Sequence, residues 1–575
     1  MNTPEILTFD KGLNTRRNSL ALDEGELVSA SGISLKTPGT IQSRTPKAKV
    51  NTTAVGSIHS LHRYKNYVML GDSKNARYKW DLNGYCNLYT SPNENFTSIG
   101  TLGNSNSWRF ADNEDFVFFV NGYDSKAFCG GTLYDWIIPN PDSAPSGTQG
   151  DSASATTPSG TYQLYYTYLI HFPNGRIYET GPSPMGTVTV AAQKKINWSK
   201  IGISTYSSAG VTIHRKLYRQ STSLVDAYYV TTIGDNTTTT YVDDFADGTL
   251  DNNTTISTYG YSGPPEGMVD VTYYMSRVFG IKESTLYPSG AYLPFTFDWG
   301  DSIQVSPSGI DLVSIISWGD QLYFATTEKW YRLQGGSPTT WSIKTAFSEI
   351  GTNNRKSCVS TRFGIIHQWY DGLYLFDGST ARCITKDQIA LSVFSNMTSP
   401  KSAYGYFDGL LYRFFYPSTG TTLDSCLVID FSDFPKMKFY NEDFITTAGE
   451  YHFPTGIFYY GKSDGYQYEE GSAEVISMSF QTGDRASKDI LHRKQMESLF
   501  YEIDTNSKDV IVTFYIDGIA QTPTITLNTS TRTREKIPLS SMWEGYRFSI
   551  KINCVNSQNV KIYEPWIITT NISGT

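Results

Sequence analysis

A pair of aromatic strands joined by a tight polar turn recurs along this chain at intervals of roughly 37 to 52 residues. The clearest copies lie at residues 63–70, 318–324, 369–376 and 406–414. Repeats of this length that are built from hairpins are typical of β-propeller blades, each of about four strands. The pattern therefore predicts a β-propeller of about six or seven blades, a scaffold that does not by itself name a function.

The composition favours the same fold class. With 575 residues the chain is too long for one core, so about three or four domains are expected. Aromatic residues reach 14% and include 41 Tyr, which suits sheets because tyrosine packs along one face and hydrogen-bonds at its tip. Helical patterns are nearly absent, and the best helix candidate runs over residues 488–500. We therefore predict an all-β protein.

The propeller pattern is interrupted once and is flanked by other segments. Several short strands follow a linker rich in Pro, Ser, Thr and Gly, at the spacing of a fibronectin-like β-sandwich inserted into the propeller. The predicted order is an N-terminal extended arm at 1–54, the first propeller blades at 55–137, the linker at 138–160, the inserted β-sandwich at 161–262, the remaining blades at 263–472 and a C-terminal β-sandwich domain at 473–575.

Charge and cysteine usage narrow the function classes. The net charge of −8 disfavours a basic groove that grips phosphates, although an acidic chain could line a passage through which nucleic acid slides without sticking. Residues 1–10 lack the basic and apolar regions of a signal peptide, and no stretch approaches about 18 apolar residues. Six cysteines without a C-x-x-C pair favour buried free thiols over a disulfide scaffold: Cys86, Cys129, Cys358, Cys383, Cys426 and Cys554.

Two groups of residues could bind a metal ion, and each has a plainer interpretation. His59 and His62 are close in sequence, but residues three apart on a strand face opposite sides, so ordinary histidines are favoured over a ligand pair. An acidic cluster lacks the D-x-D-x-D-G order of a calcium loop, which favours a polar loop that closes the inserted sandwich. The cluster consists of Asp243, Asp244, Asp247 and Asp251.

A carboxylate pair is the remaining candidate for chemistry. Glu469 and Glu470 follow a turn similar to the Asp-box of sialidases, and propellers can host glycosidases that use two carboxylates. The turn pattern is incomplete, no arginine triad can be assigned, and no Walker A loop or G-x-S-x-G motif is present. We therefore expect no enzymatic activity, and no catalytic, cofactor-binding or metal-ligating residues.

Short segments spread in order along nearly the whole chain carry a family resemblance. They are FDKGLNTR at 9–16, GTIQSR at 39–44, YYTY at 165–168, ETGPSP at 179–184, LYR at 217–219, YVDD at 241–244, TG at 482–483 and YIDG at 515–518. Together they make the chain similar to the tail nozzle, or hub, proteins of short-tailed (podovirus-type) bacteriophages. None of these segments is catalytic.

The resemblance implies a structural virion protein of the tail tip, made in the cytoplasm of the host bacterium. Such proteins form a ring, usually a homo-hexamer, below the adaptor (head-to-tail connector) ring. They line the distal DNA channel, retain the packaged DNA and pass it during ejection. The implied partners are the adaptor ring, tail fibres or spikes on the outer surface, and genomic DNA in transient, non-specific and salt-dependent contact.

Two other functions remain open at this point. The first alternative is a glycan- or receptor-binding propeller of a phage tail, spike-like and without catalysis, that would bind through exposed Tyr and Trp side chains. The second is a cytoplasmic propeller that acts as an interaction scaffold, which the inserted sandwich and the absence of WD repeats disfavour.

Overall fold

The protein is almost entirely β-structure, as the sequence predicts. The computed structural model describes residues 3–65, 67–73, 75–80, 96–151, 157–452, 456–471, 474–486, 491–540 and 543–572. The helices in these ranges are α1 (Asp247–Leu250), α2 (Ser392–Ser395) and the 3-10 turns η1 (Ser19–Ala21), η2 (Trp299–Asp301), η3 (Pro338–Thr340), η4 (Arg355–Ser357) and η5 (Pro400–Ser402). None of these described helices is long and apolar enough to cross a membrane.

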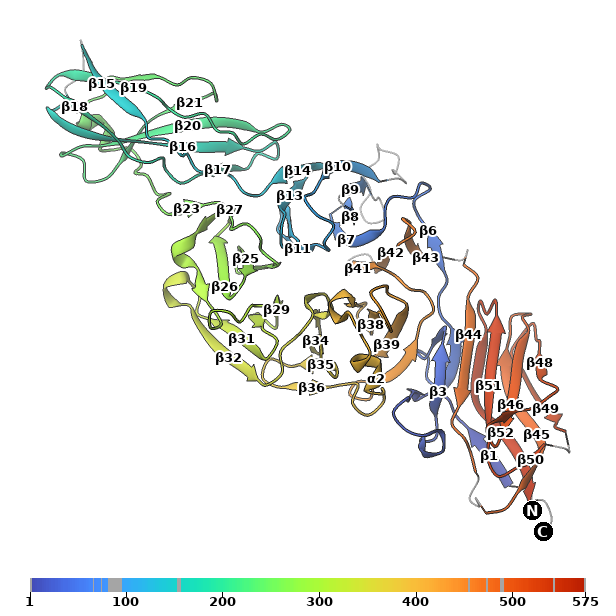
Figure 1. The fold of residues 1–575 in the computed structure, drawn as a ribbon. Helices are drawn as coiled ribbons and strands as arrows, with labels where there is room; N and C mark the ends of the chain where they lie inside the picture. The colour runs from blue at the N-terminus through green and yellow to red at the C-terminus, as the bar shows by residue number, and fades with distance from the viewer. Residues whose placement is uncertain are drawn as a thin grey trace.

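Seven small antiparallel units, called sheets here, follow one another around a common centre (Figure 1), and the sixth of them is the four-stranded end of a larger sheet. The first three comprise β7 (Ile58–Tyr64), β8 (Tyr67–Asp72), β9 (Asn75–Trp80) and β10 (Thr97–Thr101); β11 (Arg109–Asp112), β12 (Val117–Val120), β13 (Ser125–Cys129) and β14 (Thr132–Asp135); and β24 (Asp270–Tyr274), β25 (Arg277–Lys282), β26 (Thr285–Gly290) and β27 (Leu293–Asp298), extended by β23 (Tyr261–Ser262) and β28 (Ile303–Gln304).

The other four sheets repeat the same up-and-down order. They comprise β29 (Ser314–Trp318), β30 (Gln321–Ala325), β31 (Lys329–Gln334) and β32 (Ser342–Ser348); β33 (Val359–Thr361), β34 (Gly364–Trp369), β35 (Gly372–Phe376) and β36 (Ala381–Cys383); β37 (Tyr404–Phe407), β38 (Leu411–Tyr416), β39 (Ser425–Asp430) and β40 (Lys438–Asn441); and β41 (Ala448–His452), β42 (Ile457–Gly461) and β43 (Gln467–Glu470) with β6 (Lys47–Lys49). The four hairpins expected from the repeat are confirmed as β7–β8, β29–β30, β34–β35 and β37–β38.

Aromatic rings fill the space between neighbouring sheets. Trp330 of the fourth sheet stacks on Phe376 of the fifth, with ring centroids 4.7 Å apart. Tyr406 of the sixth sheet packs on Phe458 of the seventh, at 4.2 Å. Large flat side chains suit this role, because each buries much apolar area and tolerates tilted neighbours. The first strands of consecutive sheets also contact one another, including β41 of the seventh and β7 of the first.

Strand β6 joins the two ends of the repeat. It precedes the first sheet in the sequence but pairs antiparallel with β43, with Ala48 opposite Glu469. The expected extended arm at 1–54 is therefore more than a segment that packs on other domains. Its backbone completes the seventh sheet and, further upstream, adds strands to the C-terminal part of the molecule.

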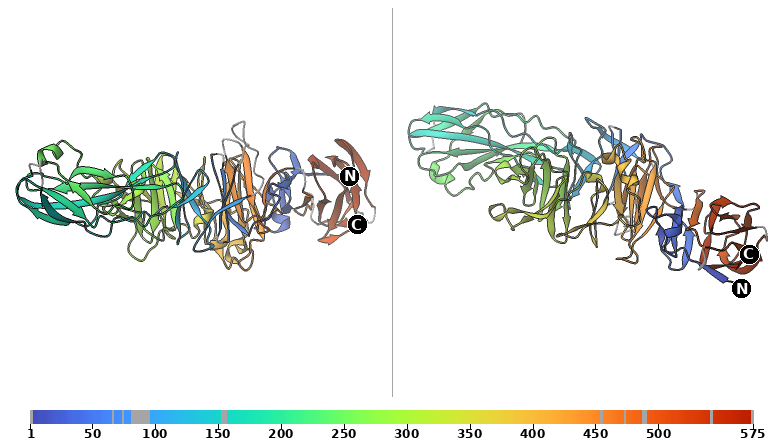
Figure 2. Two further views of the ribbon diagram at one scale, coloured as in Figure 1. Left: turned by 90° about the horizontal axis from the view of Figure 1, so that it is seen from above. Right: turned by 60° about the horizontal axis from the view of Figure 1, so that its bottom comes forward.

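The insert consists of two sheets around one core, at the opposite end of the molecule from the chain termini (Figure 2). One sheet contains β16 (Gly160–His171), β17 (Ile177–Glu179), β18 (Gly186–Val190), β20 (Thr212–Gln220) and β21 (Tyr228–Ile233), and the other contains β15 (Ser146–Asp151), β19 (Lys194–Ser199) and β22 (Tyr241–Asp243). Strand β15 lies within the expected linker at 138–160. The linker prediction missed it because β15 has no large apolar side chain and is held through its backbone pairing with β19.

Both ends of the chain build the C-terminal part. The N-terminal segment supplies β1 (Thr3–Leu7), β2 (Gly12–Leu13), β3 (Glu26–Ser31), β4 (Ile33–Ser34) and β5 (Thr40–Ser43). The other strands are β44 (Ser477–Thr482), β45 (Lys494–Asp504), β46 (Val510–Ile516), β47 (Ile519–Ala520), β48 (Ile525–Leu527), β49 (Thr533–Pro538), β50 (Glu544–Gly545), β51 (Phe548–Val555) and β52 (Lys561–Ile572). Because β1 and β5 pair with β52 and β3 pairs with β44, residues 473–575 share their sheets with the N-terminal segment.

The one helix candidate in the sequence is wrong. Residues 494–500 belong to strand β45, while residues 488–490 lie outside the described ranges. Side-chain burial alternates over much of β45, so that Met496 and Leu499 lie in the core and Gln495 and Glu497 are partly exposed. Pairing with β49 and β52 on its two sides fixes the extended backbone and overrides the weak local helical preference.

The aromatic core of the C-terminal part gives a test of the N-terminal contribution. Phe9 is fully buried, with its ring centroid 5.4 Å from that of Phe480 and 6.0 Å from that of Trp566. We expect Phe9→Ala to lower the free energy of unfolding of this part by about 3–5 kcal/mol, because it leaves a cavity in the core. Urea unfolding followed by tryptophan fluorescence measures the loss.

Ile6→Ala is the matched control, because Ile6 lies in the same segment and is half exposed. It should change the free energy of unfolding by no more than about 0.5 kcal/mol. Equal small effects of the two substitutions would contradict the inference that the N-terminal segment completes this core.

Candidate functional site

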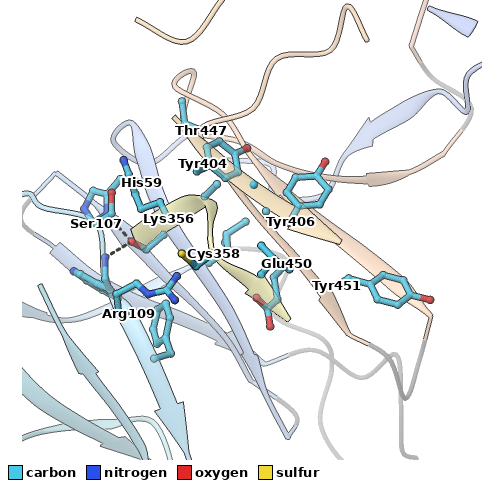
Figure 3. Close-up of a pocket in the computed structure, with 18 of the residues that line it drawn as sticks. His59, Ser107, Arg109, Lys356, Cys358, Tyr404, Tyr406, Thr447, Glu450 and Tyr451 are labelled. Atoms are coloured by element: carbon cyan, nitrogen blue, oxygen red, sulfur yellow. Dashed lines mark hydrogen bonds between the residues drawn. The ribbon is translucent and has the colours of Figure 1, made fainter. Parts of the chain in front are cut away.

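A cavity of about 300 Å³ lies where the first strands of several sheets meet (Figure 3). Its lining comes from strands β7, β11, β33, β37 and β41, from the residues just before β11, and from η4. A second cavity of about 720 Å³ shares Ser107 and Lys356 with the first, so the two adjoin. The centre of the sheet arrangement is therefore open to small molecules and is lined by residues from distant parts of the chain.

Three cationic side chains make this centre positively charged. Arg109 begins β11, whereas Arg355 and Lys356 form η4, which connects the fourth and fifth sheets. The Arg109 Nε donates to Asp270 Oδ1 at 2.8 Å, and Asp270 is fully buried at the start of β24. Arg355 Nη1 donates to the Val269 carbonyl at 2.7 Å.

Electrostatics follow from this crowding of positive charge. Burial lowers the pKa of Lys356, and the nearby guanidinium groups of Arg355 and Arg109 lower it as well, so that together they bring it to about 8. Burial also lowers the pKa of Arg355, against the attraction of Asp270. For Arg109 the pair with Asp270 outweighs burial, and its pKa is raised. Asp270 is thus paired with Arg109 and attracts Arg355, and Lys356 gains no carboxylate partner from it.

The two histidines singled out in the sequence occupy different environments. His59 lines the 300 Å³ cavity and its Nδ1 lies 2.8 Å from the Ser60 hydroxyl. His62 is stacked on Phe110 and lies between two carboxylates, with Nδ1 3.5 Å from Glu450 and Nε2 3.7 Å from Asp112. They do not form a ligand pair, and among the described residues no group of three or more His, Cys, Asp or Glu could hold a metal ion.

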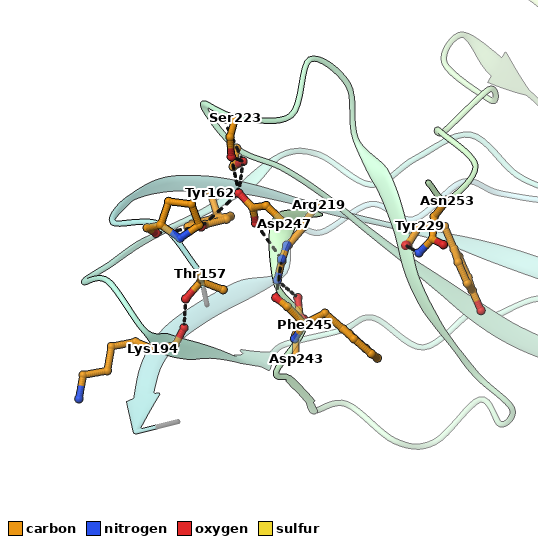
Figure 4. A network of polar contacts seen from close by, with 12 residues as sticks. Thr157, Tyr162, Lys194, Arg219, Ser223, Tyr229, Asp243, Phe245, Asp247 and Asn253 are labelled. Carbon is orange, nitrogen blue, oxygen red and sulfur yellow. Dashed lines mark hydrogen bonds and ion pairs between the residues drawn. The ribbon is translucent and has the colours of Figure 1, made fainter. Parts of the chain in front are cut away.

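The acidic cluster of the insert is a structural network, as the sequence favoured (Figure 4). Arg219 is fully buried and donates to Asp243 Oδ2 at 2.7 Å and to Asp247 Oδ1 at 2.9 Å. The other oxygen of Asp247 accepts from the hydroxyls of Ser221 and Ser223, at 2.7 and 2.5 Å. These carboxylates are committed to closing the sandwich.

The rest of that cluster and the carboxylate pair lie apart from any common site. Asp244 is partly exposed beside Asp243, and Asp251 is exposed directly after α1. Glu469 and Glu470 are neighbours on β43, where successive side chains face opposite sides. Glu469 accepts from Gln467 Nε2 at 2.9 Å, and Glu470 lies 3.5 Å from Lys47 Nζ.

The cysteines are free thiols wherever the structure describes them. Cys358, Cys426 and Cys554 are buried as expected, whereas Cys129 and Cys383 are partly exposed. Cys358 lines the central cavity, and burial raises the pKa of its thiol to about 11, so it is a protonated, unreactive group there. Cys86 lies outside the described residues.

Sequence reasoning did not find the central cations. Arg109 lies in β11 and Arg355 and Lys356 lie in η4, two segments far apart in the chain, and the net charge of −8 pointed away from any basic site. The only local signal is the run Asn353-Asn354-Arg355-Lys356, a polar dibasic turn between two hairpins. Its meaning depends on the packing that brings Arg109 beside it.

Comparisons with known proteins add no functional assignment. No protein-family model and no curated protein matches the sequence. Among solved structures, the chain is similar to the extracellular domain of a hybrid two component system from B. thetaiotaomicron (9% identity, 92% of this chain and 89% of that one, TM-score 0.19). It is also similar to a glycoside hydrolase (10%, 89% and 97%, TM-score 0.18) and to an exo-beta-1,3-galactanase from Phanerochaete chrysosporium (7%, 80% and 95%, TM-score 0.17). With TM-scores this low, these likenesses support no inference about activity.

The environment of His62 predicts a pH dependence of stability. Burial lowers its pKa, but the hydrogen bond and charge of Glu450, with Asp112, outweigh burial, so the pKa is raised in the folded protein. A raised pKa contributes stability below the unfolded value of about 6.5, and this is lost as the pH rises through the folded value. The stability advantage of the native protein over His62→Gln should therefore shrink between about pH 6 and pH 9.

His59→Gln is the control with the opposite sign. Burial lowers the pKa of His59, so its contribution is present above the unfolded pKa and declines as the pH falls through the folded value. Thermal unfolding of the three proteins from about pH 4 to about pH 9 measures both slopes, because the His59 contribution changes below about pH 6.5 and the His62 contribution above it. The same pH slope in both variants would refute the assignment for His62.

Proposed function

We propose that this chain is the subunit of a tail nozzle of a short-tailed bacteriophage, a homo-hexameric ring below the adaptor ring at the tail tip. In this proposal it is made in the host cytoplasm, lines the distal DNA channel, retains the packaged DNA and passes it during ejection. We further propose that the seven sheets are the blades of one propeller, that the insert is a fibronectin-like sandwich, and that the outer surface receives fibres or spikes.

The observation that carries the proposal is that the seven-sheet arrangement and the C-terminal part are joined by one shared sheet, called the joint below. Strand β2 lies between β40 of the sixth sheet and β3, and β3 pairs in turn with β44. One continuous sheet thus runs from β37 to β47 across both parts. A ring closes only if every subunit presents its contact surfaces at a fixed angle, and a shared sheet fixes that angle.

Residues of the family resemblance lie at this joint. Gly12 adopts a φ of +82°, and a Cβ at this position would lie 2.6 Å from the Phe439 carbonyl oxygen. Arg44 donates to Asp443 after β40 at 2.6 Å and to Glu474 before β44 at 2.7 Å. The segments similar to nozzle proteins therefore have a mechanical role here, which supports an assembly function.

Charge supports the same proposal. The net charge of −8 makes like-charge repulsion the dominant long-range interaction with DNA, so a lumen built from such subunits would let the genome slide. Any contact with DNA would be weak and would decrease steeply as the salt concentration rises.

A second candidate rests on exposed aromatic side chains. Tyr292, Trp299, Tyr123 and Tyr370 each expose more than half of their surface in loops of the sheets: 77%, 55%, 66% and 60%. Rings of this kind can stack on sugars. A glycan- or receptor-binding tail protein is therefore the alternative. Among the described residues that line the 300 Å³ cavity, Glu450 is the one carboxylate, so this cavity does not hold the carboxylate pair that a glycosidase uses.

The nozzle proposal predicts both an assembly and a location. Negative-stain electron microscopy of the purified full chain should show closed rings, and mass photometry should give about six copies if the implied hexamer forms. Immunogold labelling of particles from the source culture should place gold at the tip of a short tail. Gold on projecting fibres or spikes, or the absence of labelled particles, would overturn the proposal.

A glycan array separates the alternative. Binding that is lost in Tyr292→Ala or Trp299→Ala and kept in Tyr515→Ala, a partly exposed tyrosine of β46, would favour the glycan-binding function. An array without hits would remove it.

A further inference from the structure

The cations at the centre of the sheets lack matching anions. Lys356 Nζ donates to the Ser402 carbonyl at 3.2 Å, and Arg355 donates to a carbonyl as well. No ion pair in the described part of the chain includes either residue, whereas Arg109 has Asp270. Two positive charges are thus largely removed from water and donate only to peptide carbonyls, with Asp270 attracting Arg355 at longer range, which is an unfavourable arrangement for a protein on its own.

Asp270 cannot serve as the missing counterion. Its Oδ1 accepts from Arg109 Nε at 2.8 Å and from the Val271 amide at 3.0 Å. Its Oδ2 accepts from the Ser314 hydroxyl at 3.0 Å and from the Ile315 amide at 3.1 Å. Because each oxygen already accepts two hydrogen bonds, the carboxylate has no remaining strong acceptor site for Arg355 or Lys356.

A buried amide beside the two cations is also unsatisfied. Asn353 is 6% exposed and lines the 720 Å³ cavity, and its Oδ1 has no hydrogen-bond partner in the described part of the structure. Buried side-chain polar atoms are nearly always hydrogen-bonded, so this buried, unpaired oxygen in the wall of the cavity is an unfilled acceptor position beside the two cations. The exchange of O and N by an amide flip would make it a donor toward the same space.

The cavity has the dimensions and the access of a small-molecule site. Its volume of about 720 Å³ falls within the range of about 300–1,000 Å³ that is usual for ligand pockets. Exposed residues stand at its edge, including Lys401 and Tyr370, so the space reaches solvent. Lys401 adds positive charge at this edge and the exposed Asp311 adds one carboxylate, so the lining keeps an excess of positive charge. The Tyr370 ring offers an apolar face to an organic ligand.

We propose that this cavity binds a small organic oxyanion, a molecule with a carboxylate or phosphate group held by Arg355 and Lys356 and with a hydroxyl held by Asn353. The guanidinium and ammonium groups offer charge-assisted hydrogen bonds to the anion, and Arg109 adds attraction while it remains paired with Asp270. The low pKa of Lys356 agrees with this, because a bound anion would restore its charged form. This site goes beyond the nozzle proposal and does not depend on it.

Isothermal titration calorimetry on the full chain tests the site. Sodium phosphate and sodium acetate are titrated separately, with sodium chloride at matched ionic strength as the blank. We expect saturable binding of at least one oxyanion, weakened at least tenfold in Arg355→Ala/Lys356→Ala, because the variant removes both charged donors that hold the anion. Lys344→Ala, which removes an exposed charge from β32, should bind as the native protein does.

The two titrants identify the ligand group. Binding of phosphate alone assigns a phosphoryl group, and binding of acetate alone assigns a carboxylate. If the double variant loses its near-ultraviolet circular dichroism, Lys356→Gln is measured in its place, with the same expectation. Binding of neither anion by the native protein, or undiminished binding by a folded variant, would overturn the proposal.

Discussion

The pairing of the N-terminal segment with three other parts of the chain is the constraint on which the rest of the structure depends. Strand β6 completes the seventh sheet, β2 and β3 bridge the sixth sheet to β44, and β1 and β5 pair with β52. Backbone hydrogen bonds form these connections, and the absence of a side chain at Gly12 and the buried ring of Phe9 make them fit. Arg44 adds a charged clamp at the centre of the joint, with its side chain 4% exposed.

Charge is distributed unevenly over the protein, and the difference between the acidic chain as a whole and its cationic centre supports two separate functional inferences. The chain as a whole is acidic, which suits a wall past which nucleic acid moves. Its centre is locally cationic, because η4 places Arg355 and Lys356 beside Arg109, while the carboxylate of Asp270 is paired with Arg109 and its other oxygen accepts from Ser314. A bulk net charge cannot report such a site, since a few partly buried groups determine it. The nozzle proposal and the oxyanion site therefore rest on different observations.

Sequence patterns identified the repeating hairpins because each one is local. An aromatic alternation of period two and an Asp-Gly turn lie within about ten residues, and the strands they predict, such as β34 and β35, are present. The errors arose where pairing partners are distant. Strand β15 lacks apolar side chains and is held by β19. Residues 494–500 of the helix predicted at 488–500 belong instead to strand β45, which is held between β49 and β52.

The sequence by itself determined the all-β class and the hairpin repeat, and it favoured free thiols, found at the five described cysteines, and a structural role for Asp243 and Asp247. Only the tertiary structure decided that the chain's two ends share sheets and that cations from β11 and η4 meet at one cavity. The physical reason is the sequence separation of the residues that make contact. Local periodicity records which face of a strand is buried, whereas strand partners and convergent charges depend on contacts between residues hundreds of positions apart, which leave no pattern in a short window.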